Sequence, residues 1–195
     1  MSLNDMLRED LGIVPKSVCE DVTPEKIKED LPHLQDLVAY WRAYPDKFVD
    51  YLCSLNPTNS FKFYYYQRVY LRASMRYKHV YCVYPRGFSK SFLAVLCLML
   101  KCILYPGAKI FVVSAGKEQS ASILSSKVQE LCRLIPALGN EVVWDTRKEK
   151  GTKTSSTRDS VVYTFRNGSQ LENIALTEKT RGRRFQSGLT FIGSL

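Results

Sequence analysis

The chain has 195 residues, of which 45% are hydrophobic, and this size and composition are typical of a folded domain rather than a disordered protein. The formal net charge is +9, with 28 Lys and Arg against 19 Asp and Glu. Residues 92–104, the longest apolar run, are too few to span a bilayer, and residues 1–12 lack the apolar region of a signal peptide, so we expect a soluble protein without a membrane partner.

Charge is distributed unevenly along the chain. Residues 1–60 carry 6 Lys and Arg against 11 Asp and Glu, whereas residues 61–195 carry 22 against 8. Such an excess of positive charge favours a polyanionic partner, although a merely solubilising surface would have the same composition. We predict an acidic N-terminal extension, residues 1–60, and a basic core, residues 61–195.

The cysteine and histidine content argues against a metal site built from these residues. None of the six cysteines has C-x-x-C spacing, and most lie in apolar runs, which is typical of buried thiols in a reducing cytoplasm. With two histidines in the chain, zinc binding and His-based catalysis are not expected.

The acidic extension is predicted to be helical. Apolar residues at helical spacing favour a short helix within residues 2–11, and Thr23-Pro24 is a typical helix start, with a capping residue before a proline. Helical spacing continues through residues 34–41 and again after Pro45. The expected role of the extension is core packing or contact with a partner.

The most informative stretch is residues 80–91. Residues 80–84 form a β-branched and aromatic run of strand length, and Lys90-Ser91 opens a long apolar segment after a short loop. Strand, loop and helix in this order are typical of a nucleotide site, where backbone N–H groups face the phosphates, a lysine reaches the β and γ oxygens and a hydroxyl binds Mg²⁺. Lys90 and Ser91 fit the last two roles.

The match to the phosphate-loop pattern G-x-x-x-x-G-K-[ST] is incomplete. Tyr84 and Ser89 stand at the positions of the two glycines, and the serine leaves the tightness of the loop open. A basic turn between a strand and a helix is also common in α/β proteins that bind no nucleotide.

An aromatic-rich segment, residues 61–71, precedes this loop. Gln67 is predicted at the start of a helix, where its side-chain amide could donate to and accept from the N7 and N6 edge of adenine while an aromatic ring, Tyr66, stacks on the base. A glutamine exposed on an amphipathic helix is the alternative. The spacing to Lys90 favours the adenine-binding interpretation.

The remaining chain alternates predicted strands and helices. Residues 109–114 are a continuous apolar strand suited to a sheet covered on both faces, and a helix follows through residues 123–134. With residues 80–104, this order implies right-handed crossovers and a parallel sheet whose ligands bind at the carboxyl ends of the strands. Residues 141–145 are predicted as a short strand.

A β-hairpin is predicted in the C-terminal third. Asn167-Gly168 lies between two strand-like runs, residues 160–165 and 169–176, and this dipeptide favours hairpin turns. The tract 147–159 before it is predicted as a basic loop able to contact a DNA backbone, with a plain solvated loop as the alternative.

These motifs resemble those of a known family. An Arg-Gly-x-x-Lys-Ser loop, with Arg86 four residues before the lysine, is similar to the deviant Walker A motif of the large terminase subunit, the DNA-packaging motor of tailed bacteriophages. Gln67 resembles the adenine-reading Q motif of terminases and related helicase-like ATPases. In that family a hairpin and an Arg-Gly-x-Arg loop, here residues 181–184, precede the Walker B strand, here residues 188–192. The resemblance covers roughly residues 61–192.

The resemblance implies a fold and a set of ligands. The fold is α/β, a P-loop NTPase with a mainly parallel central sheet flanked by helices, a β-hairpin insertion and a helical N-terminal extension. The ligands are ATP and Mg²⁺, with Ser91 on the metal and Arg86 stabilising charge on the transferring phosphoryl group. The implied nucleotide-binding residues are Tyr66, Gln67, Arg86, Gly87, Phe88, Ser89, Lys90 and Ser91, of which Arg86 and Lys90 are catalytic. The residues implied to face DNA or a neighbouring subunit are Lys148, Lys150, Lys153, Arg181, Arg183 and Arg184.

The Walker B acids that the resemblance requires are missing. That motif should end in Asp-Glu, but residues 192–195 read Ile-Gly-Ser-Leu, and Asp145 is interpreted as a surface residue. The chain is then either a truncated product or a diverged domain that binds nucleotide and hydrolyses it poorly. The nuclease domain of terminases is not expected in it.

The expected function is that of the ATPase domain, or a fragment of it, of a large terminase subunit in the host cytoplasm. The full protein would couple ATP hydrolysis to translocation of double-stranded DNA into a procapsid, with a portal protein and a small terminase subunit as partners and a homo-oligomeric ring as a compatible assembly. Two alternatives stay open: a helicase-like ATPase of another DNA-remodelling system, and a nucleic-acid-binding module without ATPase activity.

Overall fold

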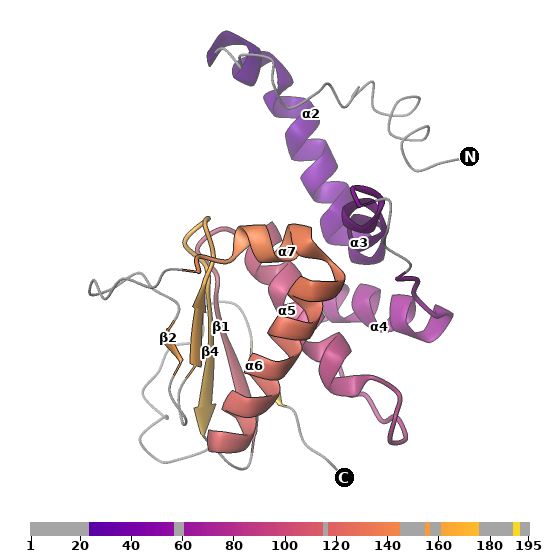
Figure 1. Cartoon of the computed structure of the whole chain (residues 1–195). Helices are drawn as coiled ribbons and strands as arrows, with labels where there is room; N and C mark the ends of the chain where they lie inside the picture. Colours follow the sequence, from indigo (N-terminus) through magenta and orange to yellow (C-terminus); the bar gives the residue numbers. More distant parts are fainter. Residues whose placement is uncertain are drawn as a thin grey trace.

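The computed structural model describes residues 24–56, 61–114, 117–144, 155–156, 161–175 and 189–191 (Figure 1). Within these ranges the protein is a mixed α/β structure, which confirms the predicted class. The helices are α2 (Pro24–Ala43), α3 (Pro45–Ser54), α4 (Tyr65–Arg76), α5 (Lys90–Leu104), α6 (Lys117–Leu134) and α7 (Pro136–Glu141). The strands are β1 (Lys109–Ser114), β2 (Ser155–Ser156), β3 (Val161–Thr164), β4 (Gln170–Ala175) and β5 (Leu189–Phe191).

The strands form one sheet in the order β2-β3-β4-β1-β5. β1 is parallel to both of its neighbours, β4 and β5, whereas β3 pairs antiparallel with β4 and with β2. The described sheet is therefore mixed rather than mainly parallel. The predicted hairpin is present as β3 and β4, with Gly168 of its turn at φ 81°, but β4 lies beside β1 and belongs to the central sheet instead of being an insertion.

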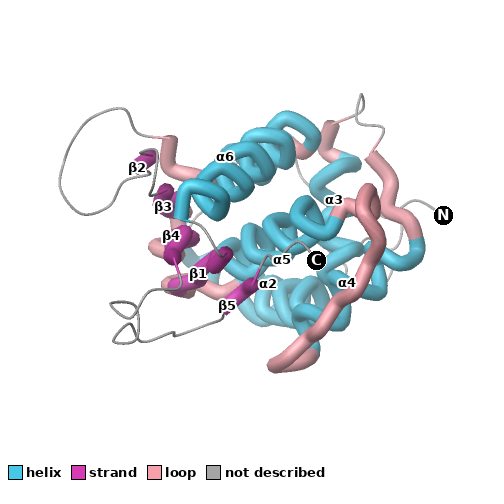
Figure 2. Tube along the Cα trace, turned by 90° about the horizontal axis from the view of Figure 1, so that it is seen from below, coloured by secondary structure: helices cyan, strands magenta, loops and turns pink. Residues whose placement is uncertain are grey.

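The described helices lie on one side of this sheet (Figure 2). α5 and α6 pack directly on β1 and β4, and α2, α3 and α4 continue the helical layer beyond α5 (Figure 2). Because side chains alternate along a strand, Ile110 and Val112 of β1 face these helices and join the main core. Phe111 and Val113 face the other way and form a small separate cluster with Ile174.

Helix α5 is the centre of the main core. Eleven of its 15 residues are buried, from Phe92 to Leu104, which explains why its sequence is apolar on all sides. Two of the predicted buried thiols, Cys97 and Cys102, lie in this helix, whereas Cys53, Cys82 and Cys132 are half-buried.

The C-terminal end of α5 is held by two side chains distant in sequence. Arg42 of α2 donates from Nε and Nη2 to the Leu104 carbonyl oxygen, at 3.0 and 2.7 Å. Asn167 of the hairpin turn donates from Nδ2 to the carbonyl oxygens of Cys102 and Ile103, at 2.7 and 3.0 Å. These bonds satisfy carbonyl groups that have no partner within the helix, and they join α2, α5 and the hairpin.

The prediction of a strand over residues 80–84 is wrong. These residues belong to none of the described strands, and Tyr81 and Val83 are 86% and 62% exposed. Both edges of β1 are already paired, by β4 and β5, so residues 80–84 have no place beside it. A sequence with high strand propensity still needs a neighbouring strand, because the preference reflects packing in a sheet.

The prediction of a strand over residues 141–145 is also wrong for its described part. Glu141 ends helix α7, which begins at Pro136, and Val142 makes only an isolated antiparallel bridge with Phe165. Proline favours the first helical position, and this signal outweighed the apolar pair that follows Glu141.

The predicted helix within residues 2–11 lies outside the described residues. None of the described helices is long and apolar enough to cross a membrane.

Candidate functional site

The loop before α5 has an unusual backbone conformation. Gly87 lies at φ 86°, and Ser89 is left-handed, with φ 53° and ψ 28°. Ser89 is the one described non-glycine residue with positive φ, and it occupies the position of the second glycine in the phosphate-loop pattern. The backbone therefore adopts at this position a conformation that favours glycine, even though the side chain is serine.

This loop leads directly into the N-terminus of α5. The Ser89 carbonyl oxygen accepts a hydrogen bond from the Leu93 N–H at 2.9 Å, but no described side chain caps the helix. The first-turn N–H groups of a helix have no partner inside it, so those of Lys90, Ser91 and Phe92 are suited to bind an anion. Because α5 reaches β1 through the short turn 105–108 and packs on it, the N-terminal end of α5, which begins at Lys90, lies toward the carboxyl end of β1.

Two cations belong to the loop. The Lys90 ammonium donates to the carbonyl oxygens of Tyr84 and Pro85, at 2.6 and 3.1 Å, so it folds back over the start of the loop. Arg86 is exposed. Among the described residues, no acidic side chain forms an ion pair with either cation, which leaves both charges available to an anionic ligand.

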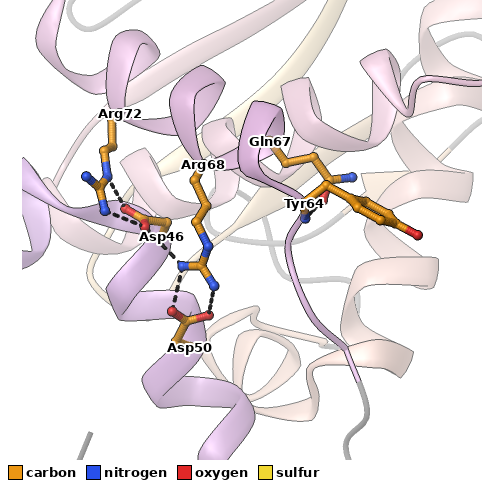
Figure 3. Close-up of polar contacts among 6 residues, drawn as sticks. All are labelled: Asp46, Asp50, Tyr64, Gln67, Arg68 and Arg72. Atoms are coloured by element: carbon orange, nitrogen blue, oxygen red, sulfur yellow. Dashed lines mark hydrogen bonds and ion pairs between the residues drawn. The ribbon is translucent and has the colours of Figure 1, made fainter.

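The first turn of α4 orients Gln67. Gln67 is 5% exposed, and its side-chain Oε1 accepts from the Tyr64 backbone N–H at 3.0 Å, which is the half of a capping box that the third helical residue supplies (Figure 3). Its Nε2 donates to Tyr66 Oη at 3.4 Å. The position of Gln67 at the start of a helix agrees with the prediction. The alternative interpretation, a glutamine exposed on an amphipathic helix, is wrong, because Gln67 is buried. An amide oxygen has two lone pairs, so the bond from Tyr64 leaves one of them unused.

Aromatic contacts bring the α4 turn and the loop together. The Tyr66 ring lies 5.4 Å from Phe88 and 5.7 Å from Tyr84, measured between centroids, and Tyr84 and Phe88 stack at 6.4 Å. Tyr64 also stacks on Tyr66, at 6.1 Å. Burial, with smaller contributions from Cys82 and Tyr66, raises the pKa of the Tyr84 phenol above its ordinary value. Phe88 is 43% exposed, which leaves part of its ring for a planar ligand.

An ion-pair network ties α4 to α3 beside this cluster (Figure 3). Asp46 is fully buried and accepts from Arg72 at 2.7 and 2.8 Å and from Arg68 at 3.0 Å. Arg68 also forms a two-pronged contact with Asp50, at 2.6 and 3.0 Å. Burial acts to raise the pKa of the Asp46 carboxyl, but hydrogen bonds from Arg72 and Arg68 outweigh it, and the pKa is lowered.

This network was not predicted from the sequence. Asp46 and Arg68 are 22 residues apart, so neither helical nor strand spacing could relate them. One signal in the sequence could have pointed to it. Arg68 and Arg72 lie one turn apart and place two positive charges on a face of α4 that is otherwise apolar, which indicates acidic partners from another segment.

The loop could bind a magnesium ion through a hydroxyl group. Ser91, half-buried, places a hydroxyl in the first turn of α5, the turn whose N–H groups have no partner within the helix. No cluster of three or more His, Cys, Asp or Glu side chains occurs among the described residues. Mg²⁺ commonly keeps several waters and uses substrate phosphates with one or two protein ligands, so Ser91 fits such a site as its single described protein ligand.

The residues assigned to DNA or subunit contact, Lys148, Lys150, Lys153, Arg181, Arg183 and Arg184, lie outside the described residues. Comparison of the sequence with protein-family models and with curated proteins found no match.

Proposed function

We propose that residues 64–91 form an ATP-binding site and that the chain acts as the ATPase domain of a large terminase subunit. The observation that carries the proposal is the contact of Tyr66 with Phe88 and Tyr84, because it places the Gln67 turn beside the loop that ends at Lys90. A base-recognising amide and a phosphate-binding loop are the two halves of a nucleotide site, and they come here from segments that are separate in the chain.

Each residue then has a role set by its chemistry. The N–H groups of the first α5 turn and the Lys90 ammonium bind the β- and γ-phosphates, and Lys90 must leave the carbonyl oxygens of Tyr84 and Pro85 to do so. Arg86 supplies a permanent, forked cation for charge on the transferring phosphoryl group. Gln67 Oε1 accepts from the N6 amino group of adenine. Mg²⁺ would be held by Ser91 and the phosphates, and it would neutralise part of the phosphate charge.

Hydrolysis is proposed to be slow. No acidic residue occurs between Asp50 and Glu118, the segment of the sequence that contains Gln67, Arg86 and Lys90. An acidic residue that orients the attacking water is a usual part of such a site. The proposed activity of this chain is therefore ATP binding with little phosphate release, and coupling to double-stranded DNA translocation belongs to the complete motor, with its portal protein and small subunit, in the host cytoplasm.

The test is the unfolding midpoint of the chain with and without Mg-ATP, measured beside Lys90→Ala and in parallel with phosphate release. A ligand that binds only the folded state stabilises it by about 2.7 kcal/mol at a hundredfold excess over Kd. We expect a rise in the midpoint that Lys90→Ala abolishes. An unchanged midpoint of the wild-type chain at millimolar ATP would contradict the proposal.

A specific observation favours a second candidate, a nucleic-acid-binding module without ATPase activity. Ten Lys and Arg and no acidic residue occur between Asp50 and Glu118, and this segment contains Lys90 and Arg86. Under this candidate the loop would hold backbone phosphates of DNA. DNA rather than ATP would then raise the midpoint, and the affinity for DNA would fall steeply with salt.

A further inference from the structure

We infer that Arg68 is a positioning residue that holds Gln67 in the orientation needed to distinguish adenine from guanine. The inference rests on the proposed ATP site and concerns its base specificity. It starts from the fact that Arg68 follows Gln67 directly in the first turns of α4, although its side chain points away from Gln67 toward α3 (Figure 3).

Arg68 is fixed on three sides. Its guanidinium donates to Asp50 through two nitrogens, at 2.6 and 3.0 Å, and to the buried Asp46 at 3.0 Å. It also lies 5.4 Å from the centroid of the Phe63 ring, within the range of a cation–π contact. The same side chain therefore joins α3, α4 and the segment that enters α4.

The Phe63 contact connects Arg68 to the amide of Gln67. Phe63 immediately precedes Tyr64, whose backbone N–H donates to Gln67 Oε1 at 3.0 Å. This bond decides which end of the amide faces which way: the oxygen turns toward Tyr64, and the NH₂ group turns toward Tyr66 Oη. Arg68 thus holds in place the residue before Tyr64, and Tyr64 sets the orientation of the Gln67 amide.

The orientation of the Gln67 amide favours adenine over guanine. Adenine presents a donor at N6, which the remaining lone pair of Gln67 Oε1 can accept. Guanine presents an acceptor, O6, at the corresponding position, so the same amide oxygen would oppose it. If the amide rotates freely, its NH₂ group can serve guanine equally well, and discrimination is lost. Phosphate binding at Lys90 does not depend on this orientation.

Arg72 provides a matched control. It binds the same buried Asp46, at 2.7 and 2.8 Å, and lies one turn further along α4, where its guanidinium is over the Tyr44 ring instead of Phe63. Loss of Arg72 therefore weakens the network and the fold without releasing the segment before Tyr64.

The experiment measures Kd for Mg-ATP and Mg-GTP by calorimetry in the wild-type chain, Arg68→Met, Arg72→Met, Gln67→Ala and the Arg68→Met/Gln67→Ala double variant. We expect the ratio of the two affinities to fall by about fivefold or more in Arg68→Met, in the range of ordinary coupling between sites. Arg72→Met should keep the wild-type ratio. The double variant should be no less selective than Gln67→Ala, since both changes remove one interaction.

A wild-type ratio in Arg68→Met, or an equal loss in Arg72→Met, would overturn the inference while leaving the ATP site intact. Failure of the wild-type chain to bind ATP would instead overturn the proposed function, and the inference with it. If Arg68→Met does not fold, Asp50→Asn replaces it, because Asp50 is partly exposed and accepts two of the three Arg68 hydrogen bonds. The same loss of selectivity is expected for that variant.

Discussion

The Tyr66 ring lies 5.4 Å from the Phe88 ring, centroid to centroid and at 49°, across a gap of more than twenty residues in the chain. The pair forms the contact between the start of α4 and the loop before α5. Aromatic pairs of this kind contribute about 0.5–1.5 kcal/mol beyond the area they bury. The relative position of Gln67 and Lys90 depends on this contact, and so do several testable properties.

Phe88→Ala is expected to weaken ATP and GTP binding equally, about 3- to 10-fold, because a stacking surface serves either purine. Calorimetric titration with both nucleotides measures this. Tyr65→Ala is the control, since Tyr65 is 83% exposed, and it should bind as the wild type does. Unchanged affinity in Phe88→Ala would place the base elsewhere.

Ser89→Gly is expected to stabilise the protein by about 0.5–1 kcal/mol. The left-handed conformation costs a non-glycine residue about 1–2 kcal/mol, and the greater freedom of glycine in the unfolded chain offsets part of the gain. Ser89→Ala, which keeps the Cβ atom, should show no such gain. Urea unfolding of the three proteins is the measurement, and equal midpoints would argue against strain at this residue.

Asp46→Asn is expected to lower the free energy of unfolding near pH 7 by about 3 kcal/mol, since it removes the acceptor shared by Arg68 and Arg72. The folded-state pKa of Asp46 lies below 3.8, so its contribution is fully present above that pH and is lost as the pH falls through the folded value. The difference between wild type and variant should therefore shrink below about pH 4. Urea unfolding at several pH values tests this, and a difference that grows on acidification would reverse the assignment.

Asn167→Asp is expected to cost about 2 kcal/mol of stability. The substitution keeps the oxygen that accepts from the Ser169 N–H at 3.1 Å but removes both donations to the end of α5. It also places a negative charge at a helix C-terminus, which is unfavourable. Arg166→Gln, at an exposed neighbouring position, is the control and should change the unfolding midpoint in urea very little.

The parts of the fold that could be predicted are those set by neighbouring residues. Residues 109–114 form β1 as predicted because the continuous apolar run of residues 110–113 fits a strand buried on both faces. The hairpin was predictable because Asn-Gly is a typical hairpin-turn dipeptide, and Gly168 supplies the positive φ of the turn. The residues 80–84 were mispredicted because whether a strand forms depends on a partner strand, and local composition does not report which edges are occupied.

The candidate site was predictable to a similar extent. The order Gln67, Arg86, Lys90 is visible in the sequence, but the Tyr66–Phe88 contact that joins the two segments is not. The left-handed conformation of Ser89 was also hidden, because serine gives no sign of positive φ. The Asp46 network depends on two helices meeting, so no spacing rule could find it.

Arg42 and Asn167 anchor the far end of α5, and this has a consequence for the loop at its near end. A helix of 15 residues is a stiff rod about 22 Å long, so its two ends move along its axis together. A shift of α5 along its axis would therefore move the backbone at Lys90 and would strain the hydrogen bonds of Arg42 and Asn167 at the other end of the helix. A pull on the hairpin turn through Asn167 would be transmitted along the rod to Ser89 and Lys90, which makes α5 a mechanical link between the hairpin turn and the proposed nucleotide site.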